Sequence, residues 1–397
     1  MAGQDAGRVA ARHFPCVPDA ATAGRLLDEI AAPNVGFAPF ATDAPIALYG
    51  AGNLGRMARE FLDAVGRPFD LVIDRNAPGL RNEPYWWGHT VMAPDTVPEA
   101  VKRSHVVLVT VATAPYVPVE EALREAGFEH VVPFYDFAEG FRNIHPLSNG
   151  WFAAPISEQD REMIGRVQDG FEDDVSRAHH LQFLAWRRLR QEWTFDGAPV
   201  TGGDRFFVPE VMKVLGDREV FVDAGAHHGS VTEAFAERVN GRFDSIVAIE
   251  PDAGNRQRLL SFLEATMPGD DRIAVLNPAL GSEERDQRFH SGLGYASQIS
   301  STGGETVRVA RLDDLTSATF LKLHLEGAEL DALKGARTML TRDRPIVAAT
   351  VYHNDDGIWR TPLWLMETLG DYRFLFRLHS WCGTGAVIYA IPQERGR

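Results

Sequence analysis

Two glycine-rich turns constrain the fold of this 397-residue chain more than any other feature of its sequence. The first turn, GAGNLG at residues 50–55, lies between an apolar segment and a helical pattern. The second turn, DAGAHHG at residues 223–229, has the same placement. A strand, a tight turn and a helix in this order begin a parallel α/β unit, because glycine lets the strand and helix approach closely. We therefore predict two such units in one chain.

Apolar runs and helical periodicity extend both units along the chain. The expected strands are 46–49, 69–73, 106–111 and 131–134 in the first half, and 220–224, 245–249, 273–276, 320–325, 345–351, 372–378 and 386–391 in the second. Helical patterns cover 20–32, 57–65 and 120–126, and a charged helical stretch covers 158–192. Only a short glycine-containing turn separates the last two strands, so they must pair antiparallel.

The predicted fold class is therefore α/β, with two Rossmann-like domains joined by a helical connector. The length also favours more than one domain, because single hydrophobic cores stop growing well below this size. We place an N-terminal arm at residues 1–44, a Rossmann-like module at 45–145, the helical connector at 146–200 and the second α/β domain at 201–397.

Composition excludes several classes of protein. The chain carries 40 Lys and Arg against 55 Asp and Glu, a formal net charge of −15, and this balance argues against nucleic acid as a partner. Its two cysteines, Cys16 and Cys382, lack CxxC spacing, which favours a reducing cytoplasm. Residues 1–12 lack the apolar stretch of a signal peptide, and the apolar run at 106–111 is too short to span a membrane.

The first turn matches the spacing of a dinucleotide-binding fingerprint. Gly50, Gly52 and Gly55 open a helix, and Asp74 ends the next expected strand, where an acid could hold ribose hydroxyls. Two interpretations stay open. The turn binds a nucleotide or nucleotide-sugar, or its glycines only let a strand and a helix pack in a scaffold or recognition module.

The second turn carries a different set of polar residues. Asp223 precedes Gly225 and could pair with the amino group of an amino-acid-like cofactor, whereas Glu250, at the tip of the next strand, could accept both ribose hydroxyls. Asn277 ends the third strand and could contact adenine. Successive strand ends meet at the crevice where open α/β sheets bind ligands. The residues expected to bind the cofactor are Asp223, Gly225, Ala226, Gly229, Glu250, Pro251, Asn277 and Ala279.

Residues 204–392 resemble the FkbM-type methyltransferases. The similarity rests on VFVDAGAHHGSVT from Val220, IEP at 249–251, LDDL at 312–315, FLKLHLEGAE with LKGA between Phe320 and Ala336, and VYH at 351–353. The resemblance implies a class I methyltransferase sheet with a closing antiparallel hairpin, S-adenosylmethionine (SAM) as cofactor and, in most members, an oxygen acceptor. His324 departs from the family, which usually has aspartate there, and an aspartate is also common near His228.

The resemblance places the candidate catalytic residues at the ends of C-terminal strands. An alkyl or sugar hydroxyl is a poor nucleophile, so a positioned base is expected, and histidine suits that task near neutral pH. We assign His324, Glu326 and His353 to this role. We assign no metal ligands, although a metal site made of His324, His353 and His379 with Glu326 is an alternative.

We therefore expect SAM-dependent O-methylation of a hydroxyl on a sugar, glycan or natural product. The N-terminal module is expected to recognise this small-molecule or glycan acceptor or to mediate a homodimer. Two alternatives remain: an NAD(P)- or nucleotide-sugar-binding oxidoreductase that uses the first glycine turn, and a non-catalytic binding protein that retains a degenerate cofactor fold.

Overall fold

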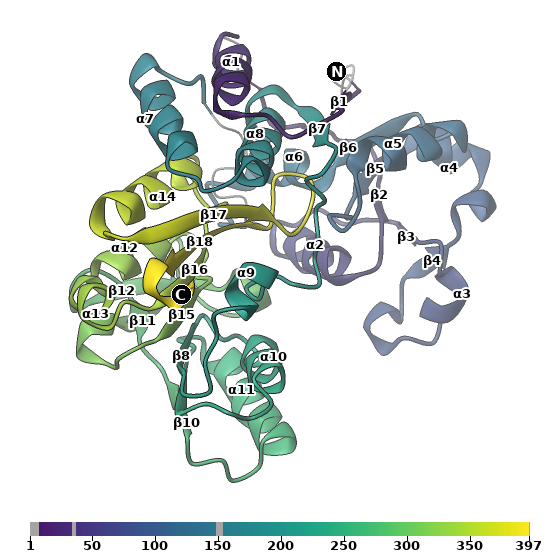
Figure 1. The fold of residues 1–397 in the computed structure, drawn as a ribbon. Coiled ribbons are helices and arrows are strands. Elements are labelled where there is room, and N and C mark those ends of the chain that lie inside the picture. Colours follow the sequence, from purple (N-terminus) through teal and green to yellow (C-terminus); the bar gives the residue numbers. More distant parts are fainter. Residues whose placement is uncertain (1–7, 34–36, 148–153, 397) are drawn as a thin grey trace.

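A computed structural model of the chain describes residues 8–33, 37–147 and 154–396, which form two parallel sheets with helices packed around them (Figure 1). The N-terminal sheet is wholly parallel, in the order β4-β3-β2-β5-β6. Its strands are β2 (Ile46–Tyr49), β3 (Leu71–Ile73), β4 (Thr90–Met92), β5 (Val106–Val109) and β6 (His130–Pro133). Its helices are α2 (Asn53–Ala64), α3 (Ala77–Leu80), α4 (Glu99–Ser104), α5 (Tyr116–Glu125) and α6 (Phe134–Ala138), with short 3-10 turns η1 (Pro84–Trp86), η2 (Pro94–Thr96) and η3 (Glu139–Phe141).

The C-terminal sheet has seven strands in the order β10-β9-β8-β15-β16-β18-β17, of which only β18 is antiparallel to its neighbours. Its strands are β8 (Val220–Ala224), β9 (Ser245–Ile249), β10 (Ile273–Leu276), β15 (Phe320–Leu323), β16 (Ile346–Thr350), β17 (Tyr372–Leu378) and β18 (Ala386–Pro392). Its helices are α9 (Pro209–Met212), α10 (Ser230–Arg238), α11 (Ala253–Thr266), α12 (Glu329–Lys334), α13 (Arg337–Asp343) and α14 (Gly357–Thr368), with 3-10 turns η5 (Leu312–Asp314) and η6 (Gln393–Gly396). The predicted α/β fold and its closing hairpin are confirmed.

A second, smaller sheet lies between β10 and β15 in the sequence and was not predicted. It pairs β11 (Ala279–Leu280), β12 (Arg285–His290), β13 (Gln298–Ile299) and β14 (Glu305–Ala310), with the 3-10 turn η4 (Gly294–Ala296) between β12 and β13. The strand β12 reads RDQRFH, so it lacks the apolar run or clean alternation that identifies strands in a sequence.

The connector consists of two helices that pack on the rest of the chain. They are α7 (Glu158–Asp169) and α8 (Asp174–Leu189). Helix α8 is joined to β17 because Ser176 accepts the amide hydrogen of Phe376, and Arg377 donates to Asp173. Trp186 near its other end is buried in the core of the N-terminal sheet. Thus one helix holds both sheets.

The N-terminal arm contains the expected helix, α1 (Ala20–Ala31), and an unexpected strand. This strand, β1 (Ala10–Phe14), pairs in parallel with β7 (Gln191–Phe195), which follows α8 within the predicted connector and was not expected in this helical region. Residues 1–7 of the predicted arm lie outside the described part of the chain.

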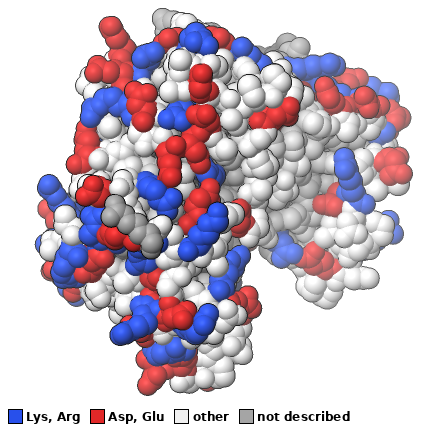
Figure 2. Space-filling view, viewed as in Figure 1, with Lys and Arg blue, Asp and Glu red and all other residues white. Residues whose placement is uncertain are grey.

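The surface view shows a notch between the lower part, which carries α10 and α11, and the part to its right, which carries α3 and β4 (Figure 2). Acidic and basic side chains are interspersed on this face (Figure 2). Among the described residues, no helix is long and apolar enough to cross a membrane.

The turn after β8 depends on a glycine for two reasons. Gly225 has a φ of +78°, and a Cβ atom there would lie 2.0 Å from the carbonyl oxygen of His324 at the end of β15. Gly241 has a similar φ of +69°, but a Cβ atom there would meet nothing within 4 Å. The two positions therefore separate the cost of the backbone conformation from the cost of the steric clash.

We predict that Gly241→Ala lowers the free energy of unfolding by about 1 kcal/mol, the ordinary cost of a left-handed residue with a side chain. Gly225→Ala should cost several kcal/mol more, because β8 and β15 cannot separate without breaking their ladder. Urea unfolding followed by fluorescence measures both. Equal losses in the two variants would contradict the close approach of the two strand ends.

Candidate active site

A small cavity lies at the carboxyl ends of β8, β9 and β15. Its volume is about 60 Å³. Six of the predicted site residues line it: Gly225, Glu250, Pro251, Ala279, His324 and Glu326. Apolar side chains, among them Ile249, Leu280, Phe289 and Leu325, supply much of the rest of its wall. The cavity is therefore suited to a flat, mainly apolar group held by a few polar contacts.

Glu250 is fixed at the tip of β9 by backbone donors. One carboxylate oxygen accepts the amide hydrogen of Asp252 at 2.9 Å, and the other accepts that of His227 at 2.8 Å. Burial raises the pKa of the Glu250 carboxyl to about 7, although these two hydrogen bonds oppose the shift. Each oxygen keeps a second lone pair, so the carboxylate can still accept two hydroxyl groups.

Asp223 does not line the cavity. Its side chain is fully buried, and its carboxylate accepts hydrogen bonds from Lys322 Nζ and Thr232 Oγ1, both at 2.7 Å. Lys322 also donates to the carbonyl oxygen of Gly225 at 2.8 Å. The structure therefore places Asp223 beneath the glycine turn, which it supports through Lys322.

Three other predicted cofactor residues also lie away from the cavity wall. Asn277 is exposed at the end of β10, whereas its neighbours Pro278 and Ala279 line the cavity. Ala226 is buried against the side of α11. Gly229 begins α10 with a φ of +93°, and a Cβ atom there would lie 2.8 Å from Leu259. The last two positions shape the turn.

His227 and Tyr295 belong to the site, but the sequence reasoning did not select them. The ring of His227 stacks on that of Tyr295 with centroids 3.8 Å apart, and its Nε2 atom is buried without a hydrogen-bond partner among the described residues. The first helical turn of α11 holds the loop that carries Tyr295, because Asp252 accepts from Gly292 and Ser297, and Asn255 donates to Gly294. Only the place of His227 inside the glycine turn could have identified it in advance.

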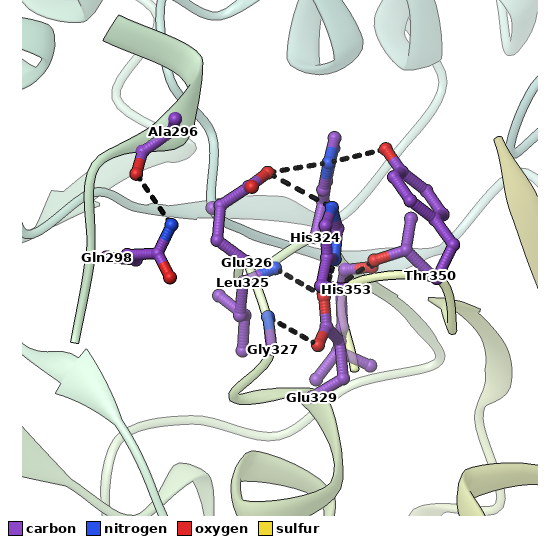
Figure 3. Close-up of polar contacts among 12 residues, drawn as sticks. Ala296, Gln298, His324, Leu325, Glu326, Gly327, Glu329, Thr350 and His353 are labelled. Carbon is purple, nitrogen blue, oxygen red and sulfur yellow. Dashed lines mark hydrogen bonds and ion pairs between the residues drawn. The ribbon is translucent and has the colours of Figure 1, made fainter. Parts of the chain in front are cut away.

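The three predicted catalytic residues come together beside this cavity (Figure 3). Glu326 Oε1 lies 3.1 Å from His324 Nε2 and 3.3 Å from His353 Nε2. Glu326 has a φ of +51°, which is unusual for a residue with a side chain. Glu326 thus adopts this unusual backbone conformation at the point where its carboxylate faces both rings. Tyr352 supplies a further hydroxyl group, 3.2 Å from His324 Nε2.

Glu329 is a buried carboxylate on the far side of His353 (Figure 3). Its Oε1 lies 3.0 Å from His353 Nδ1 and accepts from Thr350 Oγ1 at 2.7 Å, while the amides of Leu325 and Gly327 donate to the same carboxylate. His353 therefore lies between two carboxylates, one at each ring nitrogen.

The two histidines have opposite pKa shifts. Burial lowers the pKa of His324 to about 4, and the nearby positive charge of Arg205 acts in the same direction. Burial also opposes the charged form of His353, but Glu326 and Glu329 outweigh it and raise its pKa well above the usual value. The His353 cation in turn holds the pKa of both carboxyls below their usual range, against the effect of burial. Near neutral pH the cluster is therefore neutral His324, cationic His353 and two carboxylates.

The same three residues have the composition of a metal site. One ligand atom from each of His324, Glu326 and His353 falls within 4.8 Å of the others. His379, part of the alternative metal set, is engaged elsewhere, because its Nε2 lies 2.8 Å from Tyr389 Oη and its Nδ1 2.6 Å from the carbonyl oxygen of Thr201.

A second and larger cavity, of about 540 Å³, lies on the other side of the cluster. His324, Glu326 and Tyr295 line both cavities, and His353 lines the larger one. The opposite wall comes from the N-terminal sheet and includes Gly50, Gly52 and Asp74. Gly55 is buried beneath the turn instead, where a Cβ atom would lie 2.1 Å from the carbonyl oxygen of Gly50. The two glycine turns are thus on either side of one histidine–carboxylate cluster.

Comparison with known proteins identifies a related family and a shared fold. The methyltransferase FkbM domain matches residues 223–377. Among solved structures, methyltransferase FkbM from Methylobacillus flagellatus KT has 20% sequence identity and a TM-score of 0.60, and the match covers 92% of this chain and 93% of that one. At this identity the similarity shows a shared fold.

The precorrin-6y C5,15-methyltransferase from Geobacter metallireducens GS-15 also matches. It has 15% identity and a TM-score of 0.29, over 49% of this chain and 98% of that one. No match was found among curated proteins. The family match runs from the end of β8 through most of β17, which includes the second glycine turn and the histidine–carboxylate cluster. Residues 223–377 therefore form a methyltransferase domain of the FkbM family.

Proposed function

We propose that the protein transfers the methyl group of SAM to a hydroxyl oxygen of a small polar acceptor, with the cofactor in the small cavity and the acceptor in the large one. One observation supports this most strongly: the two cavities share a wall made of His324, Glu326 and Tyr295. A donor and an acceptor placed in them would meet at a proton-accepting cluster.

The residues of the small cavity fit the proposed cofactor. Glu250 offers a fixed carboxylate for ribose hydroxyls, and the apolar wall offers a place for adenine. The buried and unpartnered Nε2 of His227 is a further polar atom on this wall. This cavity is small for a nucleoside, and we expect the exposed ring of Tyr295, which stacks on His227, to move when the cofactor binds.

Bound SAM supplies a methyl group on a sulfonium, which an in-line nucleophile can displace. The chain has to position a hydroxyl and accept its proton. His324 is neutral near neutral pH, and its Nε2 carries the hydrogen because that atom faces the Glu326 carboxylate at 3.1 Å. Its Nδ1 atom takes the proton of the acceptor hydroxyl, and Glu326 stabilises the resulting imidazolium. His353 acts as a fixed cation that holds Glu326 in place. Before reaction the cluster has a net charge of −1, which favours a neighbouring sulfonium.

The cluster contains a carboxylate that can replace the aspartate that the family usually has at the position of His324. Glu326 places a carboxylate 3.1 Å from the ring of His324, from a backbone with a φ of +51°. We infer that Glu326 supplies the acidic function, and this favours an active enzyme over a degenerate binding protein.

We predict that His324→Asn lowers methyl transfer by about 10²–10⁴-fold, the usual contribution of a general base. Transfer of tritiated methyl from SAM to the small-molecule fraction of a cell extract measures it. S-adenosylhomocysteine should bind the variant with an unchanged Kd, because the loss lies in the chemical step. The control is His130→Asn, at an exposed histidine of β6.

A metal mechanism gives a different result in the same assay. If proton transfer is the role of the cluster, dialysis of the wild-type protein against EDTA leaves the rate unchanged. Loss of activity on dialysis, with recovery on adding a divalent cation, would contradict the general-base assignment.

We predict that S-adenosylhomocysteine binds about tenfold more weakly at about pH 6 than at about pH 8. Glu250 has a pKa of about 7 in the free protein, so it is mostly protonated at the lower pH, whereas ribose hydroxyls bind best to the carboxylate. Calorimetry measures the Kd. Glu250→Gln should bind weakly at both pH values.

Glu192 provides a matched control for this titration. Its pKa is also raised to about 7 by burial, but its carboxylate accepts from the amides of Tyr116 and Val117. Glu192→Gln should retain the full pH dependence of cofactor binding. A dependence that persists in Glu250→Gln would mean that Glu250 does not contact the cofactor.

We predict that Glu329→Gln destabilises the protein by about 3 kcal/mol, because it breaks a buried ion pair. Because the pKa of His353 is raised on folding, its contribution to stability is complete at pH values below the pKa of the unfolded chain. This contribution is lost as the pH rises through the pKa of the folded protein. Because the pKa of Glu329 is lowered on folding, its contribution to stability is complete at pH values above the pKa of the unfolded chain. This contribution is lost as the pH falls through the pKa of the folded protein. The loss should therefore be greatest at about pH 5–6 and shrink at alkaline pH. Urea unfolding across this range measures it, and a loss independent of pH would contradict the charge assignment.

A further inference from the structure

The first glycine turn faces the methyltransferase cluster across the large cavity. The carboxyl ends of β2, β3 and β5 supply Gly50, Asp74 and Thr110 to one wall, and β15 and the residues after β16 supply His324 and His353 to the other. Ligands of open α/β sheets bind at the carboxyl ends of the strands. Here the carboxyl ends of two such sheets line the same space.

The three glycines of this turn are not equivalent. A Cβ atom at Gly50 would lie 2.9 Å from Val111 Cγ2, and at Gly55 it would lie 2.1 Å from the carbonyl oxygen of Gly50, so packing explains both. A Cβ atom at Gly52 would meet nothing within 4 Å, and the backbone there has ordinary angles, φ −73° and ψ −162°. Packing therefore does not require glycine at position 52, whereas a ligand that approaches the backbone does.

The polar groups on the cavity wall suit an anionic, hydroxyl-rich ligand. Arg205 lines the cavity, donates to Tyr352 Oη at 2.9 Å and forms no ion pair with any described residue. Its Nε atom is buried and has no hydrogen-bond partner in the described chain. Arg187 also lines the wall, where it donates to the carbonyl oxygens of Gly383 and Tyr352. The carboxylates of Asp74 and Glu326 line the same cavity, so its wall offers cationic groups for an anion and carboxylates for hydroxyl groups.

We propose that the acceptor is a nucleoside-diphosphate sugar, whose nucleotide end binds the N-terminal sheet and whose sugar reaches His324. The volume of about 540 Å³ lies within the range of small-molecule sites. The amides at the start of α2 and the two arginines provide contacts for the diphosphate. Asp74 lines the wall at the tip of β3, and its carboxylate can accept ribose hydroxyls in addition to the amides of Ala51 and Asn76.

This proposal gives the first glycine turn a role in methyl transfer, so the turn need not indicate a separate oxidoreductase activity. A dinucleotide bound at Gly52 would direct its second half toward His324 and Glu326, where the proposed methyl transfer requires a hydroxyl. A sugar nucleotide places a hydroxyl-bearing ring at that end of the same cavity.

The inference rests on the proposed function, and binding to the two cavities can be measured separately. Calorimetry with S-adenosylhomocysteine tests the small cavity, and calorimetry with uridine diphosphate, guanosine diphosphate and NAD⁺ tests the large one. We expect S-adenosylhomocysteine and at least one nucleoside diphosphate to bind together. Failure of S-adenosylhomocysteine alone would overturn the proposed function. Failure of every nucleoside diphosphate, or binding of NAD⁺ in preference to them, would overturn the acceptor assignment and leave the methyltransferase proposal intact.

The variant Gly52→Val places a side chain in the cavity at a position where the fold has room for it. Nucleoside diphosphate binding should weaken by at least about tenfold, which corresponds to 1.4 kcal/mol, while the Kd for S-adenosylhomocysteine and the melting temperature stay close to those of the wild type. The matched control is Gly304→Val, an exposed glycine whose added Cβ atom also meets nothing within 4 Å. Equal nucleotide affinity in wild type and Gly52→Val would exclude this turn as the binding site.

A direct test of the acceptor uses the wild-type protein, SAM and a mixture of commercial nucleoside-diphosphate sugars. Mass spectrometry should detect one sugar nucleotide that has gained a methyl group, and Gly52→Val should reduce its yield. Methylation of free sugars in preference to every sugar nucleotide would overturn the inference.

Discussion

The site depends on the buried ion pair between Asp223 and Lys322. These two residues are in register on neighbouring parallel strands, and their charged atoms lie 2.7 Å apart with almost no exposure. Removing either partner would leave the other charge buried without compensation, which is strongly destabilising. Lys322 also binds the carbonyl oxygen of Gly225, and the amide of His324 donates to Ala224. One contact therefore fixes the second glycine turn relative to His324.

A second constraint is that helix α8 of the connector packs against both sheets and holds them in fixed positions. Helix α8 contacts β17 through Ser176 and Arg377 and reaches the core of the N-terminal sheet through Trp186. Arg187, the next residue, lines the large cavity and donates to the carbonyl oxygens of Tyr352, after β16, and Gly383, in the turn between β17 and β18. The same helix therefore determines the separation of the two sheets and one wall of the cavity between them, so the proposed acceptor site and the stability of the whole chain are coupled.

The sequence predicted those parts of the fold that have a local signal. Buried parallel strands are continuous apolar runs, so β8, β9 and β10 have the expected bounds. The small sheet was missed because β11 and β13 have two residues each and β12 is mostly polar, and β1 was missed because its partner β7 lies about 180 residues away. The site shows the same division. Glu250 directly follows β9, an apolar strand that the sequence identifies, and it lines the cavity. Tyr295 lies in a loop whose position is set by contacts with α11 and the residue before it.

Asp223 illustrates why a sequence pattern alone does not decide which way a side chain points. An acid at the end of the first strand is placed equally well to face a cofactor or to face the next strand, and only the register of β15 decides between them. Because Lys322 lies directly opposite, the carboxylate turns into the sheet and supports the second glycine turn. Glu326 follows β15 in a left-handed backbone conformation and faces both histidines. The ion pair and the Glu326 carboxylate therefore lie at the neighbouring ends of β8 and β15, and the position of Glu326 depends on how rigidly the ion pair holds these two strands together.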